Sequence, residues 1–475
     1  MTATLPPPPP VPAAIRQCLE SVAIENGRIV EIFTPADGEL CLPGEGYYDK
    51  LPPMAIVRLE LTPAERSFVR VEVALPEKWN GRFVGTGNGG VGGRLPSGSI
   101  YDLAKRGYAA ATTDLGTSRP APYQSGIDNP DVHKDYGYRA THLMTVVGKQ
   151  LVRARYGRDP EFSYFTGGST GGQQALSLAQ RYPADYDGIL AAVPAHCRAP
   201  LHAYFLWNYQ ATHRADNSPL FTREQERRYI QSVLEYFRDR ETLEDAKGRY
   251  VSEPRWTDAD RAAVLALAAE RDPTLTPEHI DGLRRLQDGP VHARTGERIF
   301  DGIPPATQFG PATGNLYLFN WVFGKDANYM AIDWDRDIDR YFDVLKDSVN
   351  AESTDLDAFR ARGGKLIAYS GTADSCVPYT ATLDYYERVA DRLGSFEEAQ
   401  KFFLFYILPG REHGGGPGVS ELRNAFEALV GWREKGIAPK LDAVRRGAPG
   451  LKLDLEPYPG KGPRGGVKRV AERFL

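Results

Sequence analysis

The segment that decides the fold is "YFTGGSTGGQQALSLAQRYP", residues 164–183. It joins a β-like run, 162–166, to a helix-like run, 173–181, through a serine flanked by glycines. The pentapeptide GGSTG fits G-x-S-x-G, the pattern of a nucleophile elbow, in which a tight turn leaves no room for flanking Cβ atoms and projects the serine hydroxyl. The pattern predicts Ser169 as a nucleophile. The alternative is a glycine-rich turn whose serine only caps the helix.

Strand-like and helix-like segments alternate on both sides of this turn, which is typical of a parallel sheet wrapped by helices. The alternation stops near Pro194 and resumes at 363–371, so a polar, helical insertion interrupts the sheet domain. An antiparallel pair is expected at 54–61 and 67–75, where apolar and polar residues alternate. The other expected elements are strands at 83–84, 107–115, 162–166, 188–195, 363–371 and 401–408, and helices at 136–156, after 169, at 380–393 and at 420–435.

The sequence therefore predicts an α/β fold, with the doubly wound, mostly parallel sheet of an α/β-hydrolase and a large inserted domain. We expect residues 1–50 to form an N-terminal arm and leader. Residues 51–196 and 346–475 are expected to form the catalytic domain, and 197–345 the insertion. The proline run 6–10 favours an extended arm, with an SH3-type ligand as the alternative.

A serine nucleophile needs a base, and the base needs an orienting carboxylate. On this scaffold the chain order is serine, acid, histidine. Asp374 lies just past the apolar run ending at Ser370, and His413 lies just past the run 401–408. Of the eight histidines, only His413 follows Asp374. The order therefore predicts Asp374 and His413 as the partners of Ser169; the alternatives are a loop Asx-turn and a surface histidine. Two later acids, Asp384 and Asp391, are expected to be solvated in mid-helix.

Acyl transfer also needs N–H donors for the oxyanion. One is expected from Thr170, directly after the nucleophile, and the other from Gly89 or Gly90 in "GTGNGGVGG", residues 85–93. The same loop could be read as a dinucleotide fingerprint. That alternative is disfavoured because the spacing is G-x-G-x-G-G and because residues 91–99 are not expected to open a helix.

Composition excludes several classes of function. Charged residues make up 25% of the chain and the formal net charge is -4, so a broad basic surface for nucleic acid is not expected. The four cysteines form no CxxC motif and no Cys/His cluster, which argues against zinc and against a disulfide-dense secreted domain. No run of residues is apolar and long enough to span a bilayer.

The N-terminal segment lacks the basic and apolar regions of a signal peptide. We therefore expect a soluble, cytoplasmic protein without metal or cofactor, although a secreted chain whose leader had been removed would look the same.

Six blocks occur in a characteristic order: "WNGRFVGTGNGG", "GYAAATTDLG", "DYGYRATH", "YFTGGSTGGQQALSLAQRYPADYDGILAAVPA", "FRARGGKLIAYSGTADSCVP" and "LPGREHGGGPG". With these blocks the sequence resembles the tannase and feruloyl esterase family of α/β-hydrolases, which also contains the enzyme that cleaves mono(2-hydroxyethyl) terephthalate. The resemblance runs from about Pro76 to Trp432. It implies that Ser169, Asp374 and His413 occupy the family's triad positions. It also implies that the insertion is a lid domain supplying most of the substrate pocket.

Three departures from the family stand out. Its usual cysteine pair beside the serine and the histidine is replaced by Gly168 and Gly414, which fits a reducing compartment. The family's acidic calcium loop has no counterpart; "DWDRDID", residues 333–339, is expected to be a solvated segment at a helix start.

The lid resembles the family least. Its rings are candidates for an aromatic pocket, with core packing as the alternative: Tyr204, Trp207, Tyr317, Phe319, Trp321 and Phe323.

The sequence thus predicts a serine carboxylic ester hydrolase that acts through an acyl-enzyme on a small-molecule ester, and the resemblance favours esters of aromatic acids such as gallate, ferulate or terephthalate. The first alternative is an acyltransferase using the same triad. The second is a scaffold retained only for binding. Asp135, Arg139 and His142, in "DYGYRATH", are expected to brace the glycine loop rather than take part in chemistry.

Overall fold

The structure, a computed structural model, divides the chain into two compact units. The first comprises 1–190 with 356–364, and the second 191–355 with 365–475. The predicted domain boundaries differ from these and remain a prediction. The residues that the structure describes are 8–42, 44–238, 242–245, 248–251, 256–310, 313–414, 419–422, 424–445, 452–453, 455–460 and 470–475.

A mixed sheet forms the centre of the first unit, with the order β1-β4-β5-β7-β6-β8. The strands are β1 (Gly27–Phe33), β4 (Met54–Leu61), β5 (Val69–Pro76), β6 (Arg82–Thr86), β7 (Ala109–Thr113) and β8 (Phe162–Gly168). The first three pairings are antiparallel, whereas β6 pairs in parallel with β7 and β8. The predicted antiparallel pair is confirmed as β4–β5, in which Met54 lies opposite Pro76.

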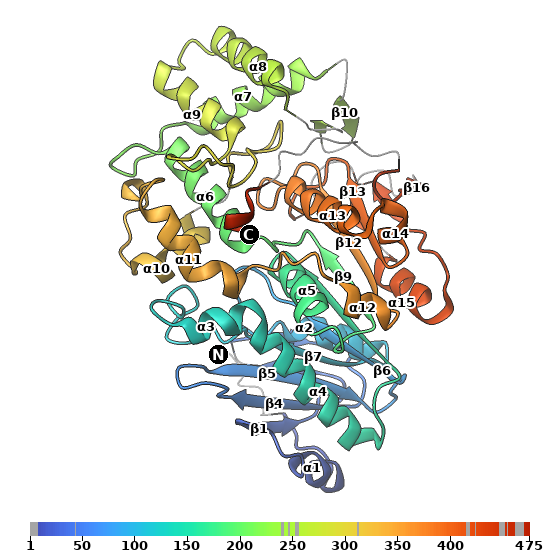
Figure 1. The fold of residues 1–475 in the computed structure, drawn as a ribbon. Coiled ribbons are helices and arrows are strands. Elements are labelled where there is room, and N and C mark those ends of the chain that lie inside the picture. Colours follow the sequence, from blue (N-terminus) through green and yellow to red (C-terminus); the bar gives the residue numbers. More distant parts are fainter. Residues whose placement is uncertain are drawn as a thin grey trace. The chain divides into compact units, whose positions relative to one another are not determined.

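Helices cover both faces of this sheet. α2 (Ser97–Lys105) and α4 (Ala140–Tyr156) each contact β5, β6 and β7, from opposite sides in Figure 1. A glycine lets α4 lie close, because a Cβ at Gly148 would come within 2.7 Å of the Phe83 ring. The helix predicted at 136–156 is confirmed, except that its first turn is π-helical over Asp135–Arg139. The short helices of this unit are α3 (Pro130–Lys134) and α12 (Asp357–Ala361).

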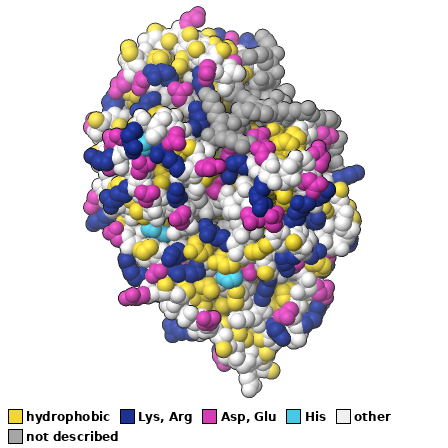
Figure 2. Space-filling model, viewed as in Figure 1, with side chains coloured by type: hydrophobic (Ala, Val, Ile, Leu, Met, Phe, Trp, Pro, Cys, Tyr) yellow, Lys and Arg dark blue, Asp and Glu magenta, His cyan; other side chains and the backbone are white. Residues whose placement is uncertain are grey.

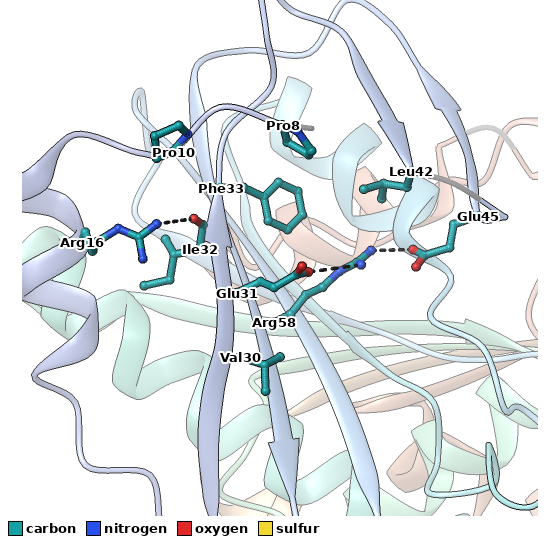
Figure 3. Close-up of a pocket in the computed structure, with 10 residues that line it drawn as sticks. All are labelled: Pro8, Pro10, Arg16, Val30, Glu31, Ile32, Phe33, Leu42, Glu45 and Arg58. Carbon is teal, nitrogen blue, oxygen red and sulfur yellow. Dashed lines mark hydrogen bonds and ion pairs between the residues drawn. The ribbon is translucent and has the colours of Figure 1, made fainter. Parts of the chain in front are cut away.

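Part of the predicted N-terminal arm is folded. It contains α1 (Ala13–Glu20), a hairpin of β2 (Leu40–Leu42) and β3 (Gly46–Tyr48), and β1, which pairs with β4 along its length. Pro9 O accepts a hydrogen bond from Thr34 N, and Arg16 donates to Ile32 O (Figure 3). Residues 1–7, including the start of the proline run, lie outside the described residues.

The second unit contains a parallel strand pair. β9 (Gly188–Ala192) carries the chain into it, and β12 (Lys365–Gly371) pairs with β13 (Phe403–Leu408). The predicted helix at 380–393 is α13 (Tyr379–Leu393), followed by α14 (Phe396–Gln400). The helix predicted from Ser420 begins later, as α15 (Ala425–Lys435), because β14 (Val419–Leu422) instead pairs with β15 (Ala443–Arg445), itself paired with β16 (Lys452–Leu453).

The segment between β9 and β12 is helical, as predicted, whereas its status as a separate inserted domain stays a prediction. Its helices are α6 (Arg198–Thr212), α7 (Arg223–Tyr236), α8 (Asp258–Arg271), α9 (Pro277–Asp288), α10 (Tyr317–Phe323) and α11 (Asp337–Val349). Threonines at 222 and 257 form capping boxes that fix where α7 and α8 begin. α6 is buried on nearly every side, so it is the central helix of this region. A hairpin, β10 (Thr242–Asp245) and β11 (Gly248–Val251), was not predicted.

Basic and acidic side chains are interspersed over the face drawn in Figure 2, as the small net charge suggests. Among the described helices, none has both the length and the apolar composition needed to cross a bilayer.

Candidate active site

Ser169 lies at the turn between β8 and α5 (Thr170–Arg181), as the segment 164–183 predicts. Its backbone angles are φ 59° and ψ -115°, a conformation that costs an ordinary side chain of order 1–3 kcal/mol. The serine precedes the first turn of a 12-residue helix, whose N-terminal N–H groups favour negative charge. A strained serine at the start of a helix is the geometry of a nucleophile elbow.

Close backbone contact explains the glycines of this turn. A Cβ at Gly167 would lie 2.6 Å from Gly171 O, and one at Gly87 would lie 2.4 Å from Gly171 Cα. Real Cβ atoms do not approach backbone atoms so closely, so the turn and the glycine loop meet backbone to backbone. The predicted lack of space beside Ser169 is therefore observed at Gly167.

Hydrogen bonds fasten the glycine loop, residues 85–93, to α5. Gly171 N donates to Asn88 O at 2.7 Å, and Asn88 N donates to the Gln174 Oε1 at 2.8 Å. Thr170 Oγ1 donates to Gly90 O at 2.6 Å. The buried Gln174 and Asn88 were not singled out by the sequence analysis, because an amide inside a helix or loop carries no motif.

Hydrogen bonds also fix the direction of the N–H groups of Gly89 and Gly90, the two candidates for the second oxyanion donor beside Thr170. The carbonyls of Asn88 and Gly89 accept from Gly171 N and Gly92 N. In a trans peptide the N–H points away from the preceding carbonyl. The N–H groups of Gly89 and Gly90 are therefore held in set orientations on an anchored loop, which is what oxyanion stabilisation requires.

Tyr136 braces the loop, since its hydroxyl donates to Gly90 O at 3.2 Å. The expectation that its neighbours do so was wrong. Asp135 pairs with Arg139 at 2.5 Å, and His142 bonds to Asp185 at 2.8 Å. Burial raises the pKa of Asp135, opposed by its hydrogen bond from Arg139.

A helix does open behind the glycine loop, contrary to prediction, because α2 begins at Ser97. One of the two arguments against a dinucleotide fingerprint is therefore lost. The other, the G-x-G-x-G-G spacing, still stands.

In the second unit, Asp374 and His413 form a hydrogen-bonded pair. The Asp374 side chain is fully buried, and its Oδ2 lies 2.8 Å from His413 Nδ1. Its Oδ1 accepts from the backbone N–H groups of Cys376 and Val377, at 2.9 and 2.8 Å. The Asx-turn considered as an alternative is thus present together with the histidine contact. A carboxylate on Nδ1 leaves Nε2 of the neutral ring as a proton acceptor.

The loops that carry this pair are tied to each other. Ala373 N donates to Arg411 O at 3.1 Å, and Gly410 N donates to Thr372 Oγ1 at 2.8 Å. From α6, the Tyr204 hydroxyl donates to Ser375 O at 2.9 Å. Ser169 belongs to the first unit and this pair to the second. Their action as one triad stays a prediction.

Comparison with known proteins identifies the family. The tannase and feruloyl esterase family model matches residues 56–330 and 312–454. This chain belongs to that family. It is 30% identical to an uncharacterized esterase of Xanthomonas campestris pv. campestris, over 86% of this chain and 79% of the relative. It is 29% identical to feruloyl esterase B of Aspergillus niger, over 84% and 79%.

Solved structures show the same fold. An esterase from Aspergillus oryzae superposes with a TM-score of 0.80 at 21% identity, covering 95% of this chain and 98% of that one. Tannin acyl hydrolase from Aspergillus niger gives 0.73 at 16%, covering 96% and 95%. The predicted α/β-hydrolase fold and the family are confirmed, and the protein is a carboxylic ester hydrolase that acts on small-molecule esters. The comparisons give no support to the acyltransferase alternative.

The family's usual cysteine pair is absent here, and all four cysteines are free thiols. Cys376 lies beside Asp374, and burial together with that carboxylate raises the pKa of the Cys376 thiol to about 12. The thiol is therefore protonated and is not a competing nucleophile. Gly168 and Gly414 occupy the positions of the missing pair.

A Cys/His/Glu group, which the sequence analysis did not expect, forms in the second unit. Ligand-type atoms of His196, Cys197 and Glu352 lie within 4.8 Å of one another. Glu352 already binds both His196 and Arg388, and Arg388 also pairs with Asp384 at 2.8 Å. Asp384 is thus buried in an ion pair, not solvated as predicted. The carboxylates in this network already have side-chain partners.

The six candidate lid rings are mostly buried. Tyr204, Tyr317, Phe319 and Trp321 are within the core of the second unit, and Phe319 stacks on Tyr341 at 4.1 Å. The other two are half-buried under arginines: Arg285 lies over Trp207, and Arg340 over Phe323. Core packing accounts for these positions, and a role in substrate binding stays a prediction.

The acidic segment 333–339 leads into α11, which begins at Asp337. Asp333 accepts from the backbone N–H groups of Asp335 and Arg336, and Arg294 pairs with Asp335 at 2.7 Å. These contacts match an exposed acidic helix start, as predicted.

Proposed function

We propose that the protein hydrolyses esters of aromatic acids through an acyl-enzyme on Ser169, with His413 as base and Asp374 as its orienting carboxylate. The backbone of Ser169 carries most weight, because a non-glycine residue at φ 59° between a strand and a helix is rare without a functional reason. The Asp374–His413 hydrogen bond supports the remaining roles.

In the first step His413 Nε2 takes the proton from Ser169 Oγ as that oxygen attacks the ester carbonyl carbon. Asp374 Oδ2 holds the Nδ1 proton and stabilises the imidazolium that forms. The developing oxyanion is bound by the N–H groups of Thr170 and of Gly89 or Gly90. His413 then protonates the departing alcohol. In the second half, His413 activates a water that releases the acid and restores Ser169.

The aromatic acid is inferred from the relatives. Feruloyl esterase B is named for an aromatic acyl group and aligns over most of both chains. Acyl specificity in this proposal lies in the ring-rich insertion, where Trp207 and Phe323 are only half-buried.

Replacing Ser169 by alanine tests the mechanism. We expect turnover of methyl ferulate to fall by about 10⁶, with labelling by a fluorophosphonate abolished. The matched control is Ser177→Ala in the same helix, since that buried hydroxyl has no hydrogen-bond partner among the described residues, so its loss breaks no hydrogen bond to them. Undiminished turnover or labelling of the Ser169 variant would disprove the mechanism.

A substrate panel tests the acid. Methyl ferulate, methyl gallate and methyl 4-hydroxybenzoate should be hydrolysed with higher kcat/KM than methyl butyrate or methyl hexanoate. A preference for the aliphatic esters would refute the aromatic-acid proposal and leave the serine mechanism intact.

A further inference from the structure

A cavity of 420 Å³ lies beside the glycine loop, entirely within the first unit. It shares Gly89 and Asn88 with that loop and extends to the N-terminus of α2. The lining residues are Glu45, Tyr48, Asn88, Gly89, Gly92 and Arg94, together with the segment 95–99. No step of the proposed mechanism uses Arg94, Ser97 or Tyr48.

Arg94 brings an uncompensated positive charge to this cavity. Its side chain is exposed, and its guanidinium makes no ion pair or hydrogen bond with any residue that the structure describes. Arg58, which lines a neighbouring hollow, is the opposite case: it pairs with Glu31 and Glu45, as Figure 3 shows. It also pairs with Glu72. The one carboxylate in the lining of the Arg94 cavity, Glu45, is therefore already bound by a guanidinium, which it shares with two other glutamates.

Two buried polar groups in the lining lack partners. Ser97 is 1% exposed and Asn88 is 5% exposed, yet neither Ser97 Oγ nor Asn88 Oδ1 forms a hydrogen bond within the described part of the chain. The Asn88 amide is oriented, because its Nδ2 donates to Thr113 O at 2.7 Å. Buried polar groups are nearly always paired, so unpaired ones at a cavity point to a ligand.

The N-terminus of α2 also favours negative charge in this cavity. α2 starts at Ser97 with no side-chain cap and no acidic residue in its first turn. Its first N–H groups and dipole therefore favour an anion at this position. Tyr48 supplies a flat wall, held by an edge-to-face contact with Tyr101 at 4.8 Å.

The geometry points to a subsite for a carboxylate of the ester substrate. Arg94 binds the carboxylate, Ser97 Oγ donates a hydrogen bond to it, and Asn88 Oδ1 accepts one from a substrate hydroxyl. This inference rests on the proposed function, since it is the shared Gly89 that connects the cavity to the reacting ester. It assigns the preferred substrates to esters that carry a free carboxylate on the acyl or the alcohol side.

Two pairs of isosteric esters test whether the carboxylate lies on the acyl side or on the alcohol side of the substrate. The alcohol-side pair is carboxymethyl ferulate and carbamoylmethyl ferulate. The acyl-side pair is monomethyl terephthalate and methyl 4-carbamoylbenzoate. We expect one pair to show about a tenfold higher kcat/KM for the charged member, the size of a charge-assisted hydrogen bond at an exposed site. The ratio should fall as salt rises.

Arg94→Gln should reduce that ratio to about one without changing kcat/KM for the amide, and Arg94→Lys should retain part of it. Ser97→Ala should lower the ratio a few fold without destabilising the fold, because the lost hydroxyl is unpaired. Arg153→Gln is the matched control: Arg153 is an exposed arginine of the same unit, on α4, and its one ion pair among the described residues is with Asp159. It should change nothing.

A wild-type ratio near one in both pairs, or an Arg94→Gln variant that slows charged and neutral esters equally, would overturn the subsite. Binding provides a readout independent of turnover. The Ser169→Ala variant should bind the charged ester about tenfold more tightly than its amide by calorimetry, and adding Arg94→Gln should remove the difference. If the enzyme hydrolysed none of the four esters, the proposed function would fail, whereas the binding comparison would still decide the subsite.

Discussion

The two halves of the predicted triad are built in different ways. The Ser169 turn is held by backbone packing: glycines at 87, 167 and 171 let three chain segments approach more closely than any side chain allows. The Asp374–His413 pair is held by hydrogen bonds to a buried carboxylate and between the two loops that carry it. The Ser169 turn therefore depends on the absence of Cβ atoms, whereas the Asp374–His413 pair depends on the polar atoms that form its hydrogen bonds.

This difference predicts which substitutions each half tolerates. In the turn, any added carbon should disturb the geometry, whatever its polarity. In the pair, isosteric changes that remove one charge or one hydrogen bond should be sufficient to abolish function without unfolding the protein. Substitutions in the Ser169 turn should therefore lower activity and stability together. Substitutions in the Asp374–His413 pair should lower activity with little change in stability.

Among the substitutions that compare the two halves, the largest effect is expected from Asp374→Asn. The amide keeps the volume and an acceptor for the N–H groups of Cys376 and Val377, but it cannot stabilise an imidazolium at His413. We expect kcat to fall by about 10⁴, with unfolding little changed. Kinetics and thermal denaturation would check this.

Asp384→Asn is the matched control. Asp384 is also buried, but it pairs with Arg388 and not with His413. It should cost about 2 kcal/mol of stability and leave the activity of the folded enzyme intact. If instead the Asp384 variant lost activity and the Asp374 variant kept it, the assignment of the orienting acid would be wrong.

The next effect is expected from Gly167→Ala. Its Cβ would lie within 2.7 Å of three backbone atoms of Gly171, so the turn must shift. A displacement of about 1 Å at a reacting group costs roughly a hundredfold in rate. We expect kcat to fall by at least that factor and the melting temperature to fall with it.

Gly431→Ala provides the comparison, because nothing lies within 4 Å of the added carbon and the residue is inside α15. That variant should be about 0.5–1 kcal/mol more stable and fully active. An active, stable Gly167 variant would show that the glycines of the turn are not needed for packing.

The strands, the helices and the turn could be predicted from local sequence, because the alternation of apolar and polar residues and the glycine–serine motif each lie within one short segment. The bracing contacts did not. Asn88, Gln174 and Tyr136 act through positions far apart in the chain, and no spacing rule marks a buried amide or a tyrosine hydroxyl. One such error lies in the segment of the π-helical turn. The sequence analysis chose Asp135, Arg139 and His142 to brace the glycine loop, whereas the hydroxyl of Tyr136 donates the hydrogen bond to Gly90 O.

Burial was the other quantity that the sequence could not supply. Asp384 was expected to be solvated because it occupies mid-helix, but its ion pair with Arg388 lets it be buried. The folded part of residues 8–50 was missed for a similar reason. β1 is mostly exposed or half-buried and lacks strong alternation, so its pairing with β4 is visible only in the structure.

A smaller effect is expected at the contact between Thr170 and the glycine loop. Thr170→Val keeps the shape but removes the hydroxyl that donates to Gly90 O. The loop then keeps the Tyr136 hydrogen bond, so we expect about a tenfold loss of kcat and about 1 kcal/mol of stability. Thr170→Ser, which retains the hydroxyl, should restore most of the activity. Equal losses in both variants would point to packing rather than the hydrogen bond.

The smallest effect is expected from Tyr204→Phe. The ring is fully buried against Phe300, and only its hydroxyl reaches the loop of Asp374, through Ser375 O. Removing the hydroxyl leaves the packing in place and frees one carbonyl, so we expect a two- to fivefold loss of kcat and about 1 kcal/mol of stability. Tyr317→Phe is the comparison, since its hydroxyl bonds to Arg198 instead. If Tyr204 orients the acid, its variant alone should alter the pH profile of kcat/KM. If both profiles stay unchanged, Tyr204 serves only to stabilise the insertion.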